Sequence, residues 1–421
     1  MSKHTLVRSA IFFLAAVTTS LGWSVAVASQ LNPAWQFQSP EVKASVGYNS
    51  NLYGVRQGAL ANQSSMVFGV EPTLTTTYRE RLRLQYSARA ETYTSAHSED
   101  NIRHNLGLRL NGGEDAWRYF LQSTQTRVQG SGEALIYDSG RNAYGTVYPR
   151  ERRNQWQNRS SSSVEWRPAE TFVRSRGRLL YYDLDTRTDN TPGYQNYLNR
   201  YDLNGGFDVG RELEVIGGDL YFAVRHGYTH QGNQGPTEST RSNHYERYFV
   251  GWEGRLFEER LRGVIEAGFG THRYNNGPAD TRLTRPYYRI ELSWQVDETN
   301  RLRLEASEWQ WVSSNVTGQG PGNFGRGLSV RFMNYLIGWD SDLANGWQLR
   351  THFHATGSNY DGRTINDWVY TVGGELNIPL GDDWKGQVSL QQNYGRDEKQ
   401  NLARSNFSRT LGAISLSRAL W

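Results

Sequence analysis

The stretch that decides the fold is residues 82–91, LRLQYSARAE, in which apolar and polar residues alternate without a break. Leu82, Leu84 and Tyr86 share one parity, while Arg83 and Gln85 take the other. Only a β-strand places alternate residues on opposite faces. The stretch therefore predicts a strand with one apolar face and one strongly polar face.

The same alternation recurs along the chain, at residues 106–110, 117–121, 288–296 and 384–390. The mean hydropathy is -0.71, and apolar residues mostly come singly rather than in the runs that fill a soluble core. A polar average with one apolar face per strand is typical of a membrane β-barrel, which meets lipid outside and water inside. A soluble β-sandwich would also alternate, so the pattern alone leaves both folds open.

The lengths of the connections favour the barrel, because tight connections alternate with long ones. The long connections include residues 51–64, 128–152, 231–243 and 313–327. The tight ones fall near residues 79–81, 112–115, 167–170, 210–212, 255–259, 297–300, 341–346 and 381–383. Short periplasmic turns and long external loops are typical of outer-membrane barrels. We therefore predict an all-β fold, a transmembrane antiparallel β-barrel of about 18 strands (16–18).

Tryptophan placement agrees with this prediction. Several tryptophans stand beside the tight turns, where indole rings would lie at the level of the lipid headgroups. They are Trp117, Trp166, Trp294, Trp339, Trp347 and Trp384. The chain also ends in an aromatic residue, Trp421, but the apolar residues Ile414, Leu416 and Leu420 lie on the opposite parity. Either a bulge or an off-phase last strand would account for this.

The first residues are typical of a secretory signal. Lys3 and Arg8 precede an apolar run at residues 10–17, and Ala26 and Ala28 supply the small residues that a signal peptidase recognises. We expect Sec-type export with cleavage near Ala28, so that residues 1–28 are a signal peptide, 29–41 a periplasmic lead-in and 42–421 an outer-membrane barrel of a Gram-negative bacterium. Losing Lys3 and Arg8 lowers the formal charge from +4 to +2, so the basic pI says little about partners.

A family resemblance adds to this interpretation. Residues 44–53, ASVGYNSNLY, the hairpin from Val67 through residues 79–81 to Tyr93, and residues 98–106 together resemble the opening of outer membrane beta-barrel proteins of the putative porin type (putative beta-barrel porin 2 family). Members of that family are often encoded beside exopolysaccharide biosynthesis genes. The resemblance implies a barrel of similar size that serves export or passage of saccharide, with no known catalytic set.

Arginine carries nearly all of the positive charge on the predicted inner face. A guanidinium binds carboxylate or phosphate through two parallel hydrogen bonds and stays charged. Residues 173–181 stand out because Arg174, Arg176 and Arg178 follow one another inward with no acid between them, which predicts an uncompensated column that favours anions. Other arginines have acids on the same face, so ladders of paired charges are expected for Arg262 with Glu266, Arg289 with Glu291 and Arg303 with Glu305. The predicted pore-lining, anion-selective candidates are Arg174, Arg176, Arg178, Arg83, Arg89, Arg200 and Arg350.

The connection at residues 128–152 is the longest and would be the third external loop. In this it resembles the general porins, whose third loop narrows the pore. Its candidate constriction residues are Tyr137, Arg141, Tyr144, Tyr148, Arg150 and Arg152, and a loop packed on the surface is the alternative.

These observations predict an outer-membrane channel that passes an anionic or polar saccharide, as in exopolysaccharide export, through an arginine-lined lumen. A general diffusion porin for small anionic solutes is the alternative. Expected partners are outer-membrane lipid and lipopolysaccharide, the barrel-assembly machinery and, for an exporter, periplasmic and inner-membrane polysaccharide export proteins. Nucleic acid is not expected, because the positive charge is spread over many strands.

An enzyme and a docking barrel are the less favoured classes. The chain has no cysteine, which excludes thiol chemistry, and we expect no catalytic residues, cofactor or metal. His352 and His354 share the predicted inner face with Asp361 and Asp367 beyond them, but polar lumen residues are common enough for such a pair to arise by chance. A docking role would fall to the lead-in, with Trp35 and Phe37.

Overall fold

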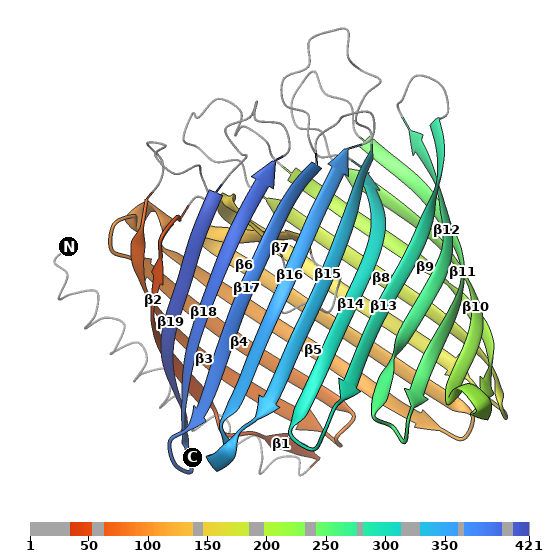
Figure 1. Ribbon diagram of the computed structural model, residues 1–421, viewed down its shortest axis with the longest axis horizontal. Coiled ribbons are helices and arrows are strands. Elements are labelled where there is room, and N and C mark those ends of the chain that lie inside the picture. The colour runs from red at the N-terminus through yellow and green to blue at the C-terminus, as the bar shows by residue number, and fades with distance from the viewer. Residues whose placement is uncertain are drawn as a thin grey trace, which may run out of the picture.

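The structure is a computed structural model that describes residues 34–52, 63–137, 146–184, 198–231, 241–275, 281–312, 329–360, 366–397 and 407–420. Within these ranges the strands β2 to β19 form a closed antiparallel barrel of 18 strands, in which each strand pairs with the next and β19 pairs with β2 (Figure 1). The predicted fold class and strand number are confirmed. No helix in the described ranges is both long and apolar enough to cross a membrane.

The strands have the following bounds. They are β1 (Trp35–Phe37), β2 (Glu41–Asn49), β3 (Ser65–Tyr78), β4 (Leu82–Tyr93), β5 (Asn101–Glu114), β6 (Trp117–Tyr137), β7 (Thr146–Trp166), β8 (Thr171–Leu184), β9 (Leu198–Leu213), β10 (Gly218–Gln231), β11 (Arg241–Leu256), β12 (Leu261–Asn275), β13 (Thr281–Gln295), β14 (Asn300–Val312), β15 (Ser329–Asp342), β16 (Gln348–Tyr360), β17 (Asn366–Pro379), β18 (Trp384–Asp397) and β19 (Phe407–Ala419). Short 3-10 turns η1 (His97–Glu99), η2 (Glu214–Ile216) and η3 (Ala344–Gly346) lie between strands.

The extra strand β1 belongs to the predicted lead-in. It pairs with residues 76–78 of β3, directly beyond the part of β3 that pairs with β2. Between these two paired segments of β3, the backbone N–H of Gln38 donates to the carbonyl of Thr75 at 3.0 Å. The lead-in is thus bound to the sheet from Trp35 onward, at the tight-turn end of the barrel (Figure 1). The predicted signal peptide lies outside the described residues.

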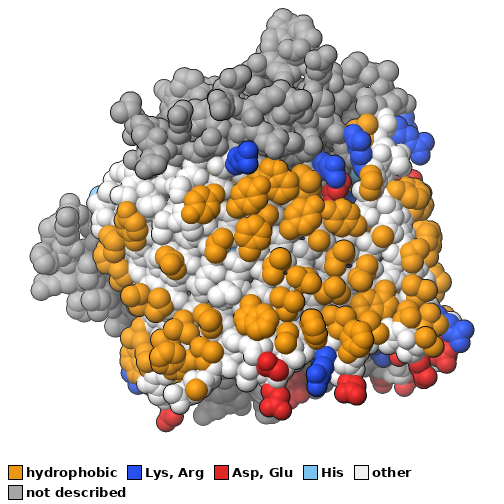
Figure 2. All heavy atoms as spheres, viewed as in Figure 1, with side chains coloured by type: hydrophobic (Ala, Val, Ile, Leu, Met, Phe, Trp, Pro, Cys, Tyr) orange, Lys and Arg blue, Asp and Glu red, His pale blue; other side chains and the backbone are white. Residues whose placement is uncertain are grey.

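The outer face of the barrel is apolar, as the alternation predicts. Figure 2 shows a band of hydrophobic side chains across the strands, with charged side chains along its two borders. In β19, Ile414 and Leu416 are exposed while Ser415 and Ser417 are buried, and the pairing with β18 runs without a break. The last strand therefore contains no bulge between Phe407 and Ala419, and Trp421 lies outside the described residues. All six tryptophans beside the tight turns are exposed on this outer face.

The tight turns lie at or near their predicted places. The largest shift is between β9 and β10, where β9 continues to Leu213 and η2 makes the turn instead of residues 210–212. Gly217 ends this turn with φ 56°, and a Cβ there would lie 2.0 Å from the carbonyl oxygen of Arg255. Only glycine combines that backbone conformation with so close an approach.

The predicted long loop at residues 128–152 is corrected by the structure. Most of it is strand, because β6 runs to Tyr137 and β7 starts at Thr146, and the two pair with register shifts beyond Val128. Three of the candidate constriction residues, Tyr148, Arg150 and Arg152, lie in β7, and Tyr137 ends β6. Arg141 and Tyr144 lie outside the described residues. The predicted narrowing of the pore stays a prediction.

The barrel wall folds sharply between β8 and β14. Cα atoms of β14 come within 8 Å of those of β10 and β11, although these strands are not neighbours in the sheet. Inner side chains from several strands consequently form one cluster, in which Phe172, Tyr221, Ala223 and Phe249 are buried and Tyr287 packs against them. Glycine makes room for this packing, since a Cβ at Gly251 would lie 2.3 Å from Cζ of Tyr221.

Candidate functional site

The inner face of the barrel carries most of the predicted site residues. Arg83 and Arg89 lie on β4, Arg174, Arg176 and Arg178 on β8, and Arg350 on β16, each on the parity opposite the exposed apolar residues of its strand. Arg200 belongs to β9, but its side chain lies outside the described ones. The structure separates the arginines that remain into two groups, those joined to carboxylates and those without one.

Two of the three arginines of the column on β8, Arg174 and Arg176, are paired with acids, which corrects the prediction of an uncompensated column for these two. Nε of Arg174 lies 2.9 Å from a carboxylate oxygen of Asp208, and Nε of Arg176 lies 2.8 Å from the same oxygen. Glu253 accepts from both arginines, at 3.2 Å and 3.0 Å, and Glu165 lies 3.4 Å from Arg174. Asp208 is completely buried. These arginines therefore serve first to neutralise buried acids.

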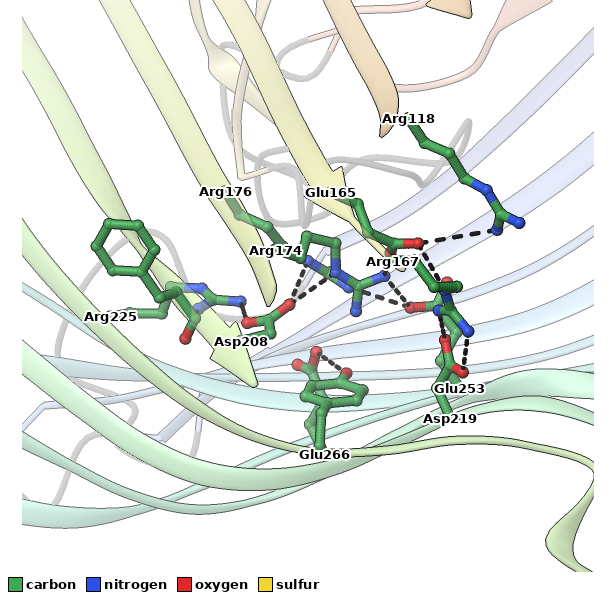
Figure 3. Close-up of polar contacts among 12 residues, drawn as sticks. Arg118, Glu165, Arg167, Arg174, Arg176, Asp208, Asp219, Arg225, Glu253 and Glu266 are labelled. Carbon is green, nitrogen blue, oxygen red and sulfur yellow. Dashed lines mark hydrogen bonds and ion pairs between the residues drawn. The ribbon is translucent and has the colours of Figure 1, made fainter. Parts of the chain in front are cut away.

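The network extends across the folded wall (Figure 3). Arg225 of β10 also donates to Asp208, so that this carboxylate binds three guanidinium groups. At the tight-turn end, Arg167 donates to Asp219 at 2.5 Å and 2.9 Å, to Glu165 at 2.9 Å and to Glu212 at 3.0 Å. These acids raise the pKa of Arg167 above its already high value, with the hydrogen bond to Asp219 as the largest cause. Arg167 stays charged and ties β7, β9 and β10 together.

Aromatic rings support the same network. The guanidinium of Arg174 lies 5.2 Å from the ring centroid of Phe172 and 5.4 Å from that of Tyr221. The hydroxyl of Tyr221 donates to Glu266 at 2.9 Å, and that of Tyr287 donates to the other oxygen of Glu266 at 2.6 Å. Charged groups that have lost water are stable only when hydrogen bonds replace it. This part of the lumen wall is therefore a rigid, charge-balanced structure.

The predicted ladders are found in part. Arg289 does pair with Glu291, at 2.7 Å, and also approaches Glu266 at 3.4 Å. Arg262 pairs with Glu259 of the adjacent turn instead of Glu266, and Arg303 pairs with Asp340 of β15 at 2.9 Å. Arg350 lies 4.0 Å from Glu375. Charge balance is thus reached mostly through neighbouring strands.

Four arginines that face one another lie on β4 and β5. The antiparallel register places Arg83 opposite Arg109 and Arg89 opposite Arg103. Arg89 pairs with Glu91 at 2.8 Å, whereas in the described part of the chain Arg83, Arg103 and Arg109 have no carboxylate partner. Like charges directly opposite one another destabilise a sheet. We call Arg83, Arg89, Arg103 and Arg109 the basic wall.

Sequence reasoning missed Arg103 and Arg109, although a signal for them was present. Both stand on the polar parity of β5, opposite Leu106, Leu108 and Leu110. What the sequence does not show is the register that sets them against Arg83 and Arg89. That register is what turns four separate arginines into one surface that can attract an anion.

Both histidines considered for catalysis lie in the barrel wall, and His354 is hydrogen-bonded there. His352 and His354 of β16 are buried on the inner face, and Nε2 of His354 contacts Oδ1 of Asn334 and the hydroxyl of Thr356. Asp361 and the side chain of Asp367 lie outside the described ones. Among the described residues no group of three or more His, Asp or Glu side chains could hold a metal ion.

Comparison with known proteins yields structural likeness alone. No protein-family profile and no curated protein sequence matches the chain. Similar solved structures are outer-membrane β-barrel porins and transporters. OccK1 (OpdK) of Pseudomonas aeruginosa is 12% identical with a TM-score of 0.45, covering 91% of this chain and 99% of that one. The FrpB iron transporter of Neisseria meningitidis is 9% identical with a TM-score of 0.44, and the matched part covers 90% of this chain but only 66% of FrpB. A bacterial polysaccharide outer membrane secretin is 6% identical with a TM-score of 0.37, covering 91% of this chain and 99% of that one. Scores this low carry no argument about function.

Proposed function

We propose that this protein is an outer-membrane channel through which polar, anionic solutes cross, and that its cargo is an anionic saccharide. The observation that carries the anionic part is the basic wall, where three arginines face the lumen with no carboxylate partner among the described residues. The apolar outer band between charged borders supports residence in a membrane (Figure 2). Tight turns at one end and long connections at the other support an outer-membrane barrel.

The size of the barrel supports a water-filled passage. Eighteen strands spaced about 4.8 Å apart and tilted by about 40° would enclose a round barrel roughly 35 Å across between backbones. Barrels of this strand number are too wide for wall side chains alone to fill. The fold between β8 and β14 occupies one side of the interior and leaves the basic wall on another part of the circumference.

The basic wall suits anions for an electrostatic reason. An arginine that already pairs with a carboxylate adds little field beyond the pair, whereas an unpaired guanidinium raises the local concentration of anions within about one Debye length. Arg83 and Arg109 lie at the tight-turn end, and Arg89 and Arg103 lie six residues further along their strands. A solute would therefore meet successive cationic pairs along one side of the channel.

Charge selectivity in planar bilayers tests this part of the proposal. The triple variant R83Q/R103Q/R109Q removes the unpaired charges, and the double variant R350Q/E375Q is a matched control because it removes one arginine and one acid together. We expect the reversal potential under a salt gradient to show anion preference in the native protein and the control, and to lose it in the triple variant. A cation-selective native channel, or a triple variant with unchanged selectivity, would contradict the proposal.

The saccharide part rests on the sequence resemblance and needs its own test. A general diffusion channel for small anionic solutes is the second candidate, and the width of the barrel favours it. Deleting the gene separates them. Loss of extracellular polysaccharide with normal uptake of small solutes is expected for an exporter. Reduced uptake of small anions with normal polysaccharide would indicate the general channel.

A further inference from the structure

The folded wall contains a cavity that is separate from the basic wall. Its volume is about 90 Å³, enough for about six waters. It lies between β8, β9, β11, β13 and β14, on the inner face of the barrel. Arg178, Asp202, Asn204, Arg247, Tyr287 and Ser307 are among its lining residues. Charged, amide, hydroxyl and aromatic groups thus meet around one small space.

Arg247 is the unusual residue of this cavity. Its guanidinium lies 4.6 Å from the ring centroid of Tyr245 and 5.2 Å from that of Tyr287. In the described part of the chain it forms no ion pair or hydrogen bond with a carboxylate. Most arginines of the folded wall, in contrast, bind acids directly. A cation held by ring faces keeps its N–H donors available for an anion.

The two tyrosines hold Arg247 in a fixed position. The hydroxyl of Tyr245 donates to Asp202 at 3.0 Å and that of Tyr287 donates to Glu266 at 2.6 Å, so each ring is anchored at its far end. Tyr245 packs against Gly227, where a Cβ would lie 2.1 Å from Cζ of its ring. Positioning of this kind reduces the entropy lost when a ligand binds.

Hydroxyl-binding groups complete the cavity. Asp202 accepts from Thr229 at 2.6 Å, and the side-chain amide of Asn204 donates to Asp202 at 3.1 Å. Asn204, Ser307, Glu291 and Glu305 also line the cavity. Three arginines line the cavity, Arg178, Arg247 and Arg289, and Arg289 is paired with Glu291 at 2.7 Å. Arg247, held by ring faces, is the cation that suits a carboxylate, and the carboxylate, amide and hydroxyl groups around it can accept from hydroxyl groups. This combination matches the chemistry of a sugar acid.

We propose that this cavity is a binding site for a sugar acid, whose carboxylate is held by Arg247 and whose hydroxyls are held by Asp202, Asn204 and Ser307. The proposal rests on the proposed function in one respect, since the ligand must enter the lumen, and it names the chemical class of the solute. A binding site in the folded wall would slow the passage of each solute molecule and select among anions by their hydroxyl groups, whereas the basic wall attracts anions in general.

Calorimetry on the purified, detergent-solubilised protein tests the site with D-galacturonate as the probe. Galactose lacks the carboxylate and acetate lacks the hydroxyls, so we expect both to bind more weakly than galacturonate. We expect R247Q to weaken galacturonate binding by about tenfold or more, because a charge-assisted hydrogen bond is lost. R247K, which keeps the charge without the two-point geometry, should bind with intermediate affinity.

R301Q is the matched control, because Arg301 lies on the inner face of β14 outside the cavity and binds Gln295 at 3.1 Å. It should bind galacturonate as the native protein does. Mobility of unheated protein on gels shows whether each variant is folded, and R247K gives a second result if R247Q is not. Equal binding of galacturonate by native protein and R247Q would overturn the proposal, as would galactose or acetate binding as well as galacturonate.

Calorimetry needs no ion flow, so the two proposals fail separately. A protein that binds galacturonate through Arg247 but forms no channel in bilayers refutes the proposed function alone. A conducting, anion-selective channel that does not bind galacturonate refutes the cavity site alone.

Discussion

Replacing Asp208 with asparagine tests whether the β8 arginines stabilise the wall. Asp208 is completely buried and binds Arg174 at 2.9 Å, Arg176 at 2.8 Å and Arg225. Asparagine keeps the shape and one acceptor oxygen but leaves three guanidinium groups without their shared charge. A hydrogen bond to a charged group contributes about 1.5–3 kcal/mol, and removing one partner of a buried charge network costs about 3–5 kcal/mol. Because these contributions are not additive, we expect D208N to lower the free energy of unfolding by about 3 kcal/mol.

The measurement is denaturant unfolding in lipid vesicles, followed by the mobility of unheated samples on gels. E375Q is the control, because Glu375 lies 4.0 Å from Arg350 and both side chains are substantially exposed, so its loss should cost less than about 1 kcal/mol. A second readout is charge selectivity, since D208N leaves two lumen arginines of β8 with less compensation and should strengthen anion preference. If D208N unfolds no more easily than E375Q, the ion pairs of the folded wall are not what stabilises it.

Three further predictions concern packing and the tight-turn end of the barrel. G251A should destabilise the barrel by about 1–3 kcal/mol, because its Cβ would meet the buried ring of Tyr221 at 2.3 Å, whereas G374A, with no atom closer than 3.7 Å, should be nearly neutral in the same unfolding assay. R167M should cost about 3 kcal/mol, because it leaves Asp219 and Glu165 without their cation, while R211M, whose pair with Glu170 is exposed, should leave the unfolding midpoint almost unchanged. Asp297 accepts hydrogen bonds from the side chain of Asn300 and from Thr299, and these lower the pKa of its carboxyl to about 2. Because this pKa is lower than the ordinary Asp value near 4, the ionised carboxylate stabilises the turn above pH 4, and this stabilisation is lost as the pH falls through about 2. The unfolding midpoint of D297N should therefore depend less on pH between 4 and 2 than that of the native protein.

Most of the fold could be predicted from the sequence because its cause is local. A strand that crosses lipid must turn every second residue outward, so the apolar parity of residues 82–91 is set by the membrane and not by distant contacts. The hairpin of β6 and β7 shows where this reasoning fails. Beyond Val128 the two strands continue past the ends of β5 and β8, so the alternation that lipid imposes no longer applies, and residues 128–152 read as loop.

The candidate site was less predictable because it depends on which strands meet across the lumen. Parity correctly puts Arg176 on the polar face, but its acidic partners Asp208 and Glu253 come from β9 and β11. Asp208 is the neighbour that a known register would give, whereas Glu253 reaches Arg176 only because the wall folds. Glycines on the inner face, such as Gly251 and Gly227, are the sequence signal for that fold, since they leave room for Tyr221 and Tyr245. Their spacing has no meaning until the register of neighbouring strands is known.

Curvature of the wall therefore determines which arginines remain available to solute. Where the wall folds, inner faces of strands three apart approach one another, and Arg174 and Arg176 meet Glu253 as well as Asp208. On β4 and β5 the described residues opposite Arg83 and Arg89 are themselves arginines, and of these four only Arg89 has a carboxylate partner among the described residues, so most of the positive charge stays uncompensated. A residue larger than glycine at position 251 would displace the Tyr221 ring that packs beside Arg174. It should make the β8 arginines more accessible to solute and lower the stability of the barrel. Anion selectivity that rises in G251A while its stability falls would show that the shape of the wall, and not the number of arginines, sets the charge that a solute meets.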